Sequence, residues 1–226
     1  MQTISNSVII STSIIAGDLS TIGSDIKTYN SDIIDMLHMD VMDGNFVPNL
    51  TFGPGFIGNL KRHTKIPLDI HLMIEKPENS LTKYIELNPK YITLHYESTR
   101  FPARYLNLIR ENGICSGLAL NPSTPIEAVF DLMEYCDMIL IMSVDPGFYG
   151  QPFMKQSISR IGRLKEKLLA NNFSKVKIQV DGGINETNIN DVVSAGADIV
   201  VAGNSLFKDG DINQNTLRLK KFLLVN

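Results

Sequence analysis

The chain reads HMDVMDGNFVPN at residues 38–49, directly after the largely apolar run at residues 33–37. An apolar run that leads into polar residues and then a loop with glycine and proline predicts a buried β-strand. Because successive side chains of a strand point to opposite faces, His38, Asp40 and Met42 are expected on one face. An imidazole and a carboxylate so placed form half of a metal site or an acid/base pair, or else they are buried polar groups that satisfy each other.

The same arrangement, a short apolar run followed by a longer helical pattern, recurs along the whole chain. Strands are expected at residues 8–15, 33–42, 67–74, 91–97, 115–120, 137–144, 176–180 and 198–202. Helices are expected from residue 18, at 53–62, 77–88 and 102–111, from residue 124, and at 153–170 and 215–224. Strands that alternate with helices indicate an α/β protein with a parallel sheet, and eight such units should close into a (β/α)8 barrel.

Length and composition favour one domain with a large core. Single barrels run to about 200–250 residues, so the 226 residues are expected to form one domain over 1–226. The net charge of −3 gives no reason to expect a nucleic-acid partner. Cys115 and Cys136 are too few for a disulfide framework, which favours a reducing cytoplasm. Neither membrane insertion nor secretion is expected, since the longest apolar run, 138–142, is short and the start lacks a basic segment.

Polar side chains gather at the carboxyl ends of the expected strands, where barrels carry their reactive groups. They are Ser13, His38, Asp40, His71, His95, Glu97 and Asp181. Four of them form a possible metal-binding set: His38, Asp40, His71 and Asp181. Two nitrogen and two oxygen donors suit Zn²⁺ and could also hold Mn²⁺, Fe²⁺ or Co²⁺, which would act as a Lewis acid on substrate oxygens. The alternative is that the histidines are core residues hydrogen-bonded to carboxylates.

Asp40 and Asp181 come from strands that are well separated around the expected ring. Their carboxyl groups can therefore approach a small substrate from opposite sides. Inversion of a C–H stereocentre needs this arrangement, because one group removes a proton and the other returns one from the far face. The hydrogen must lie α to a carbonyl, and a metal that holds the enediolate oxygens would stabilise the intermediate. The alternative is a pair of unrelated surface acids.

Three glycine-containing loops follow the expected sixth, seventh and eighth strands, at residues 147–150, 182–183 and 203. Barrels commonly bind phosphate with backbone N–H groups at this place. One such loop is most often a plain turn, but three at neighbouring strand ends favour a phosphate site.

In these motifs the chain resembles the ribulose-phosphate 3-epimerase family. The matching segments are HMDVMDGNFVPN at 38–49, LDIHLMI at 68–74, MSVDPGFYGQPF at 142–153, VDGGI at 180–184 and VAGN at 201–204. They cover nearly the whole length in order. The resemblance implies a TIM barrel that interconverts D-ribulose 5-phosphate and D-xylulose 5-phosphate through a 2,3-enediolate in the pentose phosphate pathway.

The resemblance also implies roles for individual residues. It places the ligands of a divalent metal at His38, Asp40, His71 and Asp181, and the proton acceptor and donor at Asp40 and Asp181. It places substrate contacts at Ser13, His71, Gly147, Phe148, Tyr149, Gly150, Asp181, Gly182, Gly183, Gly203 and Asn204. Members of the family are often oligomeric, so the resemblance implies a homo-oligomer whose small-molecule partner is a ketose phosphate.

Several positions depart from the family pattern. Tyr149 replaces a usual glycine in the phosphate loop, and Asn204 replaces a usual serine. Asp145, together with the segment 151–153, is similar to the related allulose-6-phosphate 3-epimerases, which act on a six-carbon ketose phosphate, whereas the intact segment 181–183 favours the pentulose enzyme. The hexulose-phosphate epimerase and a non-catalytic sugar-phosphate-binding barrel remain as alternatives, although a binder would not need two carboxylates on opposite faces.

Overall fold

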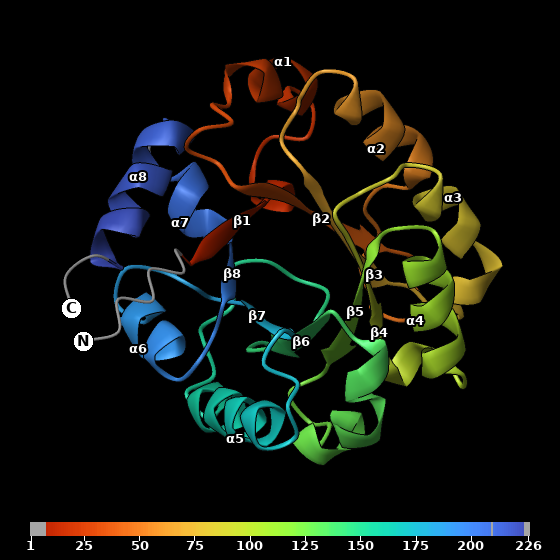
Figure 1. Cartoon of the computed structure of the whole chain (residues 1–226). Coiled ribbons are helices and arrows are strands. Elements are labelled where there is room, and N and C mark those ends of the chain that lie inside the picture. Colours follow the sequence, from red (N-terminus) through yellow and green to blue (C-terminus); the bar gives the residue numbers. More distant parts are fainter. Residues whose placement is uncertain (1–7, 209, 224–226) are drawn as a thin grey trace.

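Eight short strands, most of them fully buried, form a closed parallel ring in the computed structural model, which describes residues 8–208 and 210–223 (Figure 1). The strands follow the ring in chain order, and β1 closes it by pairing with β8. They are β1 (Ile9–Ser13), β2 (Met36–Met42), β3 (Leu68–Met73), β4 (Tyr91–His95), β5 (Cys115–Leu120), β6 (Met138–Met142), β7 (Lys177–Asp181) and β8 (Ile199–Ala202). The TIM-barrel prediction is confirmed.

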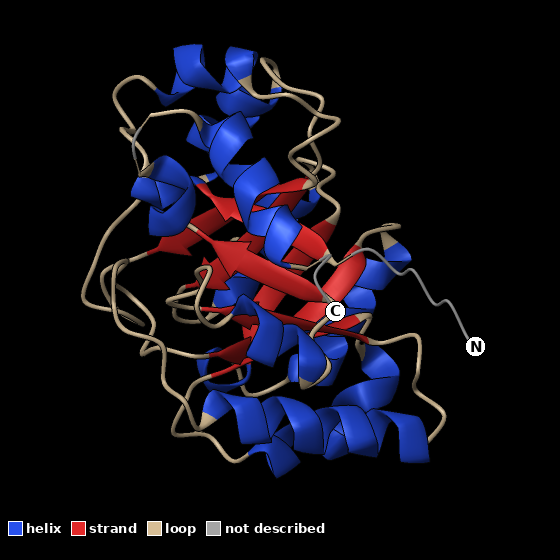
Figure 2. Cartoon of the chain, turned by 90° about the vertical axis from the view of Figure 1, so that its left-hand side faces the viewer, coloured by secondary structure: helices blue, strands red, loops and turns tan. Residues whose placement is uncertain are grey.

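Helices connect the strands and cover the outside of the ring (Figure 2). The α-helices are α1 (Ile22–Asp25), α2 (Pro54–Lys61), α3 (Leu81–Ile85), α4 (Pro102–Glu111), α5 (Ser157–Ala170), α6 (Ile189–Ser194), α7 (Asn204–Phe207) and α8 (Ile212–Phe222). The 3-10 helices are η1 (Ile14–Ala16), η2 (Ile26–Thr28), η3 (Pro77–Asn79), η4 (Tyr96–Ser98) and η5 (Ile126–Tyr135). No helix in the described parts of the chain is both long and apolar enough to cross a membrane.

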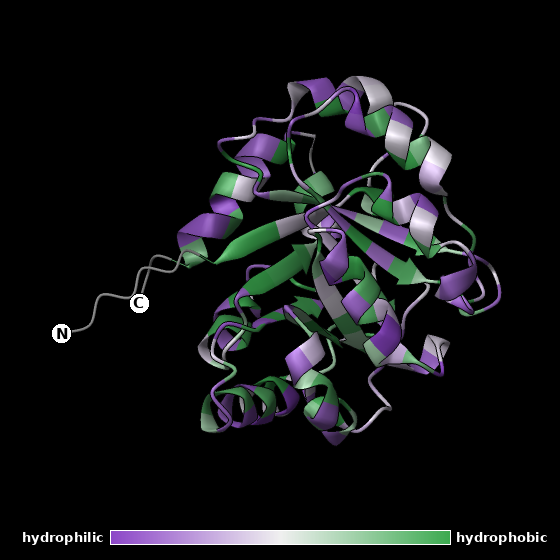
Figure 3. Cartoon of the chain, turned by 45° about the vertical axis from the view of Figure 1, so that its right-hand side comes forward, coloured by the Kyte–Doolittle hydropathy of each residue, from purple (hydrophilic) through white to green (hydrophobic). Residues whose placement is uncertain are grey.

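Because side chains alternate along each strand, half of them point outward toward the helices and half point into the centre of the barrel. Met39 and Val41 point outward into the main apolar core, where they share a cluster with helix residues such as Leu164. His38 and Asp40 are buried too, and they lie on the opposite face of β2, where they contact His71 and Ser13. Figure 3 shows mostly apolar strands at the centre and helices in which apolar and polar residues alternate.

Several helix boundaries differ from the sequence-based prediction. The helix expected from residue 18 consists of the short α1 and η2, the one at 77–88 is divided into η3 and α3, and the one from 124 is the 3-10 helix η5. The helix expected at 153–170 begins at Ser157, because the N–H of Met154 donates to the carbonyl of Ser143 and holds that segment against the end of β6.

The chain ends and strand ends also differ in detail. β4 ends at His95, so Glu97 lies in η4 and not in the strand. The last helix begins at Ile212, not 215, because the Asp211 side chain accepts hydrogen bonds from the first N–H groups of α8. Its expected end at residue 224, and the expectation that the chain start carries no secretion signal, fall on residues outside the described ranges. The sequence did not indicate α7, which begins at Asn204.

Candidate active site

The stagger of the ring brings residues from different positions along their strands to one level. His38 is only the third residue of β2, yet it pairs with Ser13, the last residue of β1. Asp40 pairs with His71 on the other side of β2. Asp181 is the last residue of β7. The polar side chains therefore meet near the carboxyl ends of the strands, although His38 is not at the end of its own strand.

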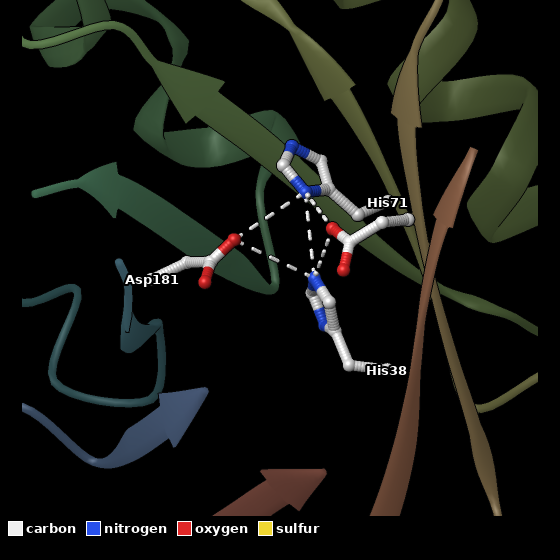
Figure 4. A group of neighbouring side chains, drawn as sticks. His38, His71 and Asp181 are labelled. Carbon is white, nitrogen blue, oxygen red and sulfur yellow. Dashed lines mark hydrogen bonds and ion pairs between the residues drawn. The ribbon is translucent and has the colours of Figure 1, made fainter. Parts of the chain in front are cut away.

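Four of these side chains converge inside the barrel (Figure 4). His38 Nε2 lies 3.2 Å from Asp40 Oδ1 and 3.4 Å from His71 Nδ1. His71 Nδ1 lies 3.3 Å from the same Asp40 oxygen. Asp181 Oδ2 lies 3.7 Å from each of these two imidazole nitrogens, and Figure 4 shows its carboxyl group pointing toward both rings. One donor atom from each residue lies within 4.8 Å of the others, so the cluster could hold a metal ion.

The electrostatics of the two carboxyl groups fit a cation between them. Burial raises the pKa of Asp181, and the charge of Asp40 raises it further, to about 7. Burial also opposes the ionisation of Asp40, but His38 and His71 outweigh burial and hold the pKa of Asp40 well below its usual range. Two carboxylates this close repel each other unless a positive charge neutralises them, so the donor set fits a divalent metal.

Asp69 fixes the orientation of the His38 imidazole by binding the nitrogen that faces away from the cluster. Its Oδ2 lies 2.8 Å from His38 Nδ1 and also accepts hydrogen bonds from Ser11 and Gln179. Because the carboxylate accepts at Nδ1–H, the other nitrogen of His38 faces the cluster, as in a metal-binding histidine. Burial alone lowers the pKa of His38, but Asp40 and Asp69 outweigh it and raise that pKa well above its usual value.

A second chain of hydrogen bonds leads away from His71. His71 Nε2 lies 2.8 Å from His95 Nε2, and His95 Nδ1 lies 3.3 Å from Glu97 Oε2. Burial is the main cause that lowers the pKa of both imidazoles, that of His95 to about 4. The sequence placed His95 and Glu97 at a strand end without a role, and the structure places them directly behind His71.

Ser13 and a large cavity lie above the cluster. The Ser13 hydroxyl donates to Asp40 Oδ2 at 2.6 Å, so Asp40 directs one oxygen to the histidines and the other to Ser13. The cavity has a volume of about 1010 Å³. Asp40 and Asp181 reach its wall, whereas His38 and His71 are fully buried beneath it. Its wall also contains three methionines near strand ends: Met42, Met73 and Met142.

The glycine-containing loops after β6, β7 and β8 lie along this cavity. The remaining candidate residues in its wall are Gly147, Phe148, Tyr149, Gly150, Gly182, Gly183, Gly203 and Asn204. Gly183 has a φ of +67°, and a Cβ at this position would lie 2.6 Å from the backbone nitrogen of Phe153. Only glycine therefore allows the loops after β6 and β7 to pack backbone against backbone.

Two of the departures from the family pattern, Tyr149 and Asn204, occupy different places in these loops. The Tyr149 side chain is 62% exposed at the cavity rim, so its ring is free to face a ligand or solvent. The Asn204 side chain reaches across to the loop after β6, since a Cβ at Gly150 would lie 2.9 Å from its Nδ2 atom. Within that loop Gln151 donates hydrogen bonds to the carbonyls of Asp145 and Phe148.

Fold and site together define a class: a (β/α)8-barrel enzyme with a metal-type donor cluster beneath a glycine-lined cavity. Residues 9–207 match the sequence model described as the ribulose-phosphate 3 epimerase family. The chain belongs to this family of isomerases that act on carbohydrates.

Relatives in the family are similar over most of their length. The chain is 42% identical over 212 residues to a ribulose-phosphate 3-epimerase of Aquifex aeolicus, covering 94% of this chain and 95% of the relative. It is 35% identical over 199 residues to a ribulose-phosphate 3-epimerase of Bacillus subtilis, covering 88% and 92%.

Solved structures of lower identity share the barrel. KGPDC from Streptococcus mutans has a TM-score of 0.72 at 8% identity and covers 96% of this chain and 97% of its own. Orotidine 5'-phosphate decarboxylase from Pyrococcus horikoshii has a TM-score of 0.65 at 16% identity and covers 96% and 100%. At these identities the likeness shows the fold alone.

Proposed function

We propose that the protein is a metal-dependent epimerase that inverts C3 of D-ribulose 5-phosphate to give D-xylulose 5-phosphate. One observation carries this proposal: Asp40 and Asp181 lie at the base of one cavity but come from β2 and β7, three strands apart in the ring. Inversion requires two acid/base groups on different sides of one carbon. The names of the relatives support the choice of sugar phosphate.

In this mechanism one carboxylate takes the C3 proton and the other carboxyl group delivers a proton to the opposite face, which leaves a 2,3-enediolate between the two steps. In the direction from ribulose to xylulose phosphate, Asp40 would act as the base and Asp181 as the proton donor. The reverse reaction exchanges the two roles. Ser13, which donates to Asp40, would orient that carboxylate toward C3.

The proposed cofactor is a divalent metal ion, with Zn²⁺ as the first choice and Fe²⁺, Mn²⁺ or Co²⁺ as alternatives. Its ligands would be His38, Asp40, His71 and Asp181. When bound, the ion supplies the positive charge that stabilises negative charge on the substrate oxygens.

We place the phosphate of the substrate against the three glycine-containing loops, at residues 147–150, 182–183 and 203–204. Their backbone N–H groups can bind an anion without a basic side chain. The sugar carbons would then extend down to Ser13 and His71, with Phe148 and Tyr149 at the rim. This position leaves C3 near the two carboxyl groups.

The first test is proton NMR of the purified protein with D-ribulose 5-phosphate in D₂O, with and without a strong chelator. We expect loss of the C3 proton signal and appearance of xylulose 5-phosphate, and we expect the chelator to stop both. Asp181→Asn should abolish turnover with the fold intact, whereas Asp131→Asn, at an exposed acid that does not line the cavity, should not. Appreciable turnover by the Asp181 variant would contradict the two-base mechanism.

The second candidate is D-allulose-6-phosphate 3-epimerase, because a cavity of about 1010 Å³ also has room for a six-carbon ketose phosphate. The ratio of kcat/KM for the two ketoses decides between them. A C3 signal that persists with both ketoses and added metal would instead support a non-catalytic sugar-phosphate-binding barrel.

Three broader expectations belong to the same proposal. The chain works as one domain, it forms a homo-oligomer, and it resides in the cytoplasm. The free thiols of Cys115 and Cys136 support a reducing compartment. Light scattering of the purified protein measures the oligomeric state directly.

A further inference from the structure

The tautomer of His71 decides whether it can bind a cation. A neutral imidazole carries one N–H and one bare nitrogen, and only the bare nitrogen can donate electrons to a metal. Nδ1 of His71 faces His38, Asp40 and Asp181. To bind a cation at Nδ1, His71 must therefore carry its proton on Nε2, away from the cluster.

The partner of Nε2 is the ring of His95. The two Nε2 atoms lie 2.8 Å apart, which is a hydrogen bond in which one nitrogen donates and the other accepts. Both rings are fully buried, so water does not compete for these nitrogens. Whether His71 donates or accepts depends on which nitrogen of His95 carries its proton.

Glu97 settles that question. Its Oε1 accepts the backbone N–H of Asn121 at 2.9 Å and is hydrogen-bonded to the Thr124 hydroxyl, and its Oε2 faces His95 Nδ1. A carboxylate with these neighbours can only accept. His95 must donate from Nδ1, so its Nε2 is bare and accepts from His71 Nε2–H, which leaves His71 Nδ1 bare toward the cluster. Asp40 Oδ1 could accept a proton from that Nδ1 instead, but this contact, at 3.3 Å, is longer than the 2.8 Å bond between the two imidazoles.

We propose that Glu97 and His95 are positioning residues that fix the tautomer of His71 and thereby prepare its Nδ1 to bind the divalent cation. The proposal rests on the cation site of the proposed function. The opposite tautomer would point an N–H at the cation and leave the bare Nδ1 of His95 facing a carboxylate. Partners of this kind behind a metal-binding histidine typically change metal affinity about 10- to 100-fold when they are replaced.

The variant that reverses the chain of hydrogen bonds is Glu97→Gln. The Gln carbonyl can still accept from Asn121, while its amide N–H can donate to His95 Nδ1. His95 would then donate from Nε2, and the proton of His71 would move to Nδ1. The shape of the side chain is retained, so the change acts on the direction of the hydrogen bonds.

Two measurements test this variant. The ¹⁵N chemical shifts of the imidazoles, recorded without metal, should show His71 protonated at Nε2 in the wild type and at Nδ1 in Glu97→Gln. Zn²⁺ affinity, measured by competition with a chromophoric chelator, should fall about 10- to 100-fold. An unchanged tautomer together with an affinity within about twofold of wild type would overturn the proposal.

Two matched control variants distinguish the effect of a changed tautomer on Zn²⁺ affinity from a general effect of substitution. Thr124→Val removes a hydrogen bond to the same carboxylate but keeps its charge, and Glu86→Gln changes an exposed glutamate at the C-terminal end of α3. Both should keep the wild-type tautomer and a Zn²⁺ affinity within about twofold. A loss of affinity in Thr124→Val as large as in Glu97→Gln would overturn the tautomer explanation.

These measurements do not depend on turnover. If Glu97→Gln fails to fold, the wild-type spectrum alone is decisive, because His71 protonated at Nδ1 contradicts the proposal. If Glu97→Gln reverses the tautomer of His71 and weakens Zn²⁺ binding, the result supports the tautomer proposal whether or not the protein exchanges C3 of D-ribulose 5-phosphate. Failure to exchange C3 would contradict only the proposed function.

Discussion

Asp181 and His38 both carry protons that a cation would have to replace. Their pKa values are raised, that of Asp181 to about 7 by burial and by the charge of Asp40. For His38, the two carboxylates at Asp40 and Asp69 outweigh the effect of burial. Protons and metal therefore compete for the same atoms of the cluster.

We expect the affinity for Zn²⁺ to rise with pH from 6 to 8. The sign follows from the raised pKa values, because both groups are protonated in the metal-free protein below about pH 7 and must lose those protons to become ligands. Calorimetry in two buffers with different ionisation enthalpies measures the protons released per metal bound. An affinity that does not change with pH would contradict this description of the cluster.

At the scale of the elements, the loops after β6 and β7 approach each other closely at Gly183. Gly183→Ala should raise KM for the ketose phosphate roughly tenfold, because its Cβ would meet the backbone of Phe153 and the residue has a φ of +67°. Steady-state kinetics checks the effect, and a kcat that falls with unchanged KM would contradict it.

The matched control is Gly162→Ala in α5, where a Cβ meets no atom within 4 Å. Alanine should stabilise this helix by about 0.5–1 kcal/mol and leave KM unchanged. Urea denaturation measures the stability of both variants on the same scale.

The elements also show what the sequence could and could not predict. The strands were found because their residues are apolar and mostly buried, and the candidate cluster because His38, Asp40 and His71 lie on the inner face by simple alternation. The 3-10 helices η2, η3 and η5 were expected as parts of ordinary helices, because an apolar periodicity does not distinguish the two kinds of helix. The role of Glu97 was missed because it acts through His95, and a contact between side chains leaves no pattern in the sequence.

At the scale of the whole molecule, the barrel and its helices share one main apolar core. Leu164→Ala should lower the free energy of unfolding by about 2–5 kcal/mol, because Leu164 is 0% exposed within that core. Leu169→Ala, on the same helix but 55% exposed, should change it by less than about 0.5 kcal/mol. Urea denaturation followed by circular dichroism compares the two, and equal losses would contradict the assignment of the core.

Because β1 pairs with β8, the first strand of the barrel must wait for the last one before the ring can close. His38, Asp40 and His71 leave the ribosome before Asp181, which lies on β7, and the ring can close only after β8. At about 5–20 residues per second, a nascent chain carries an incomplete donor set for several seconds. Binding of a divalent cation by the proposed cluster is therefore expected only after β7 and β8 have been synthesised, and not during the early folding of the chain.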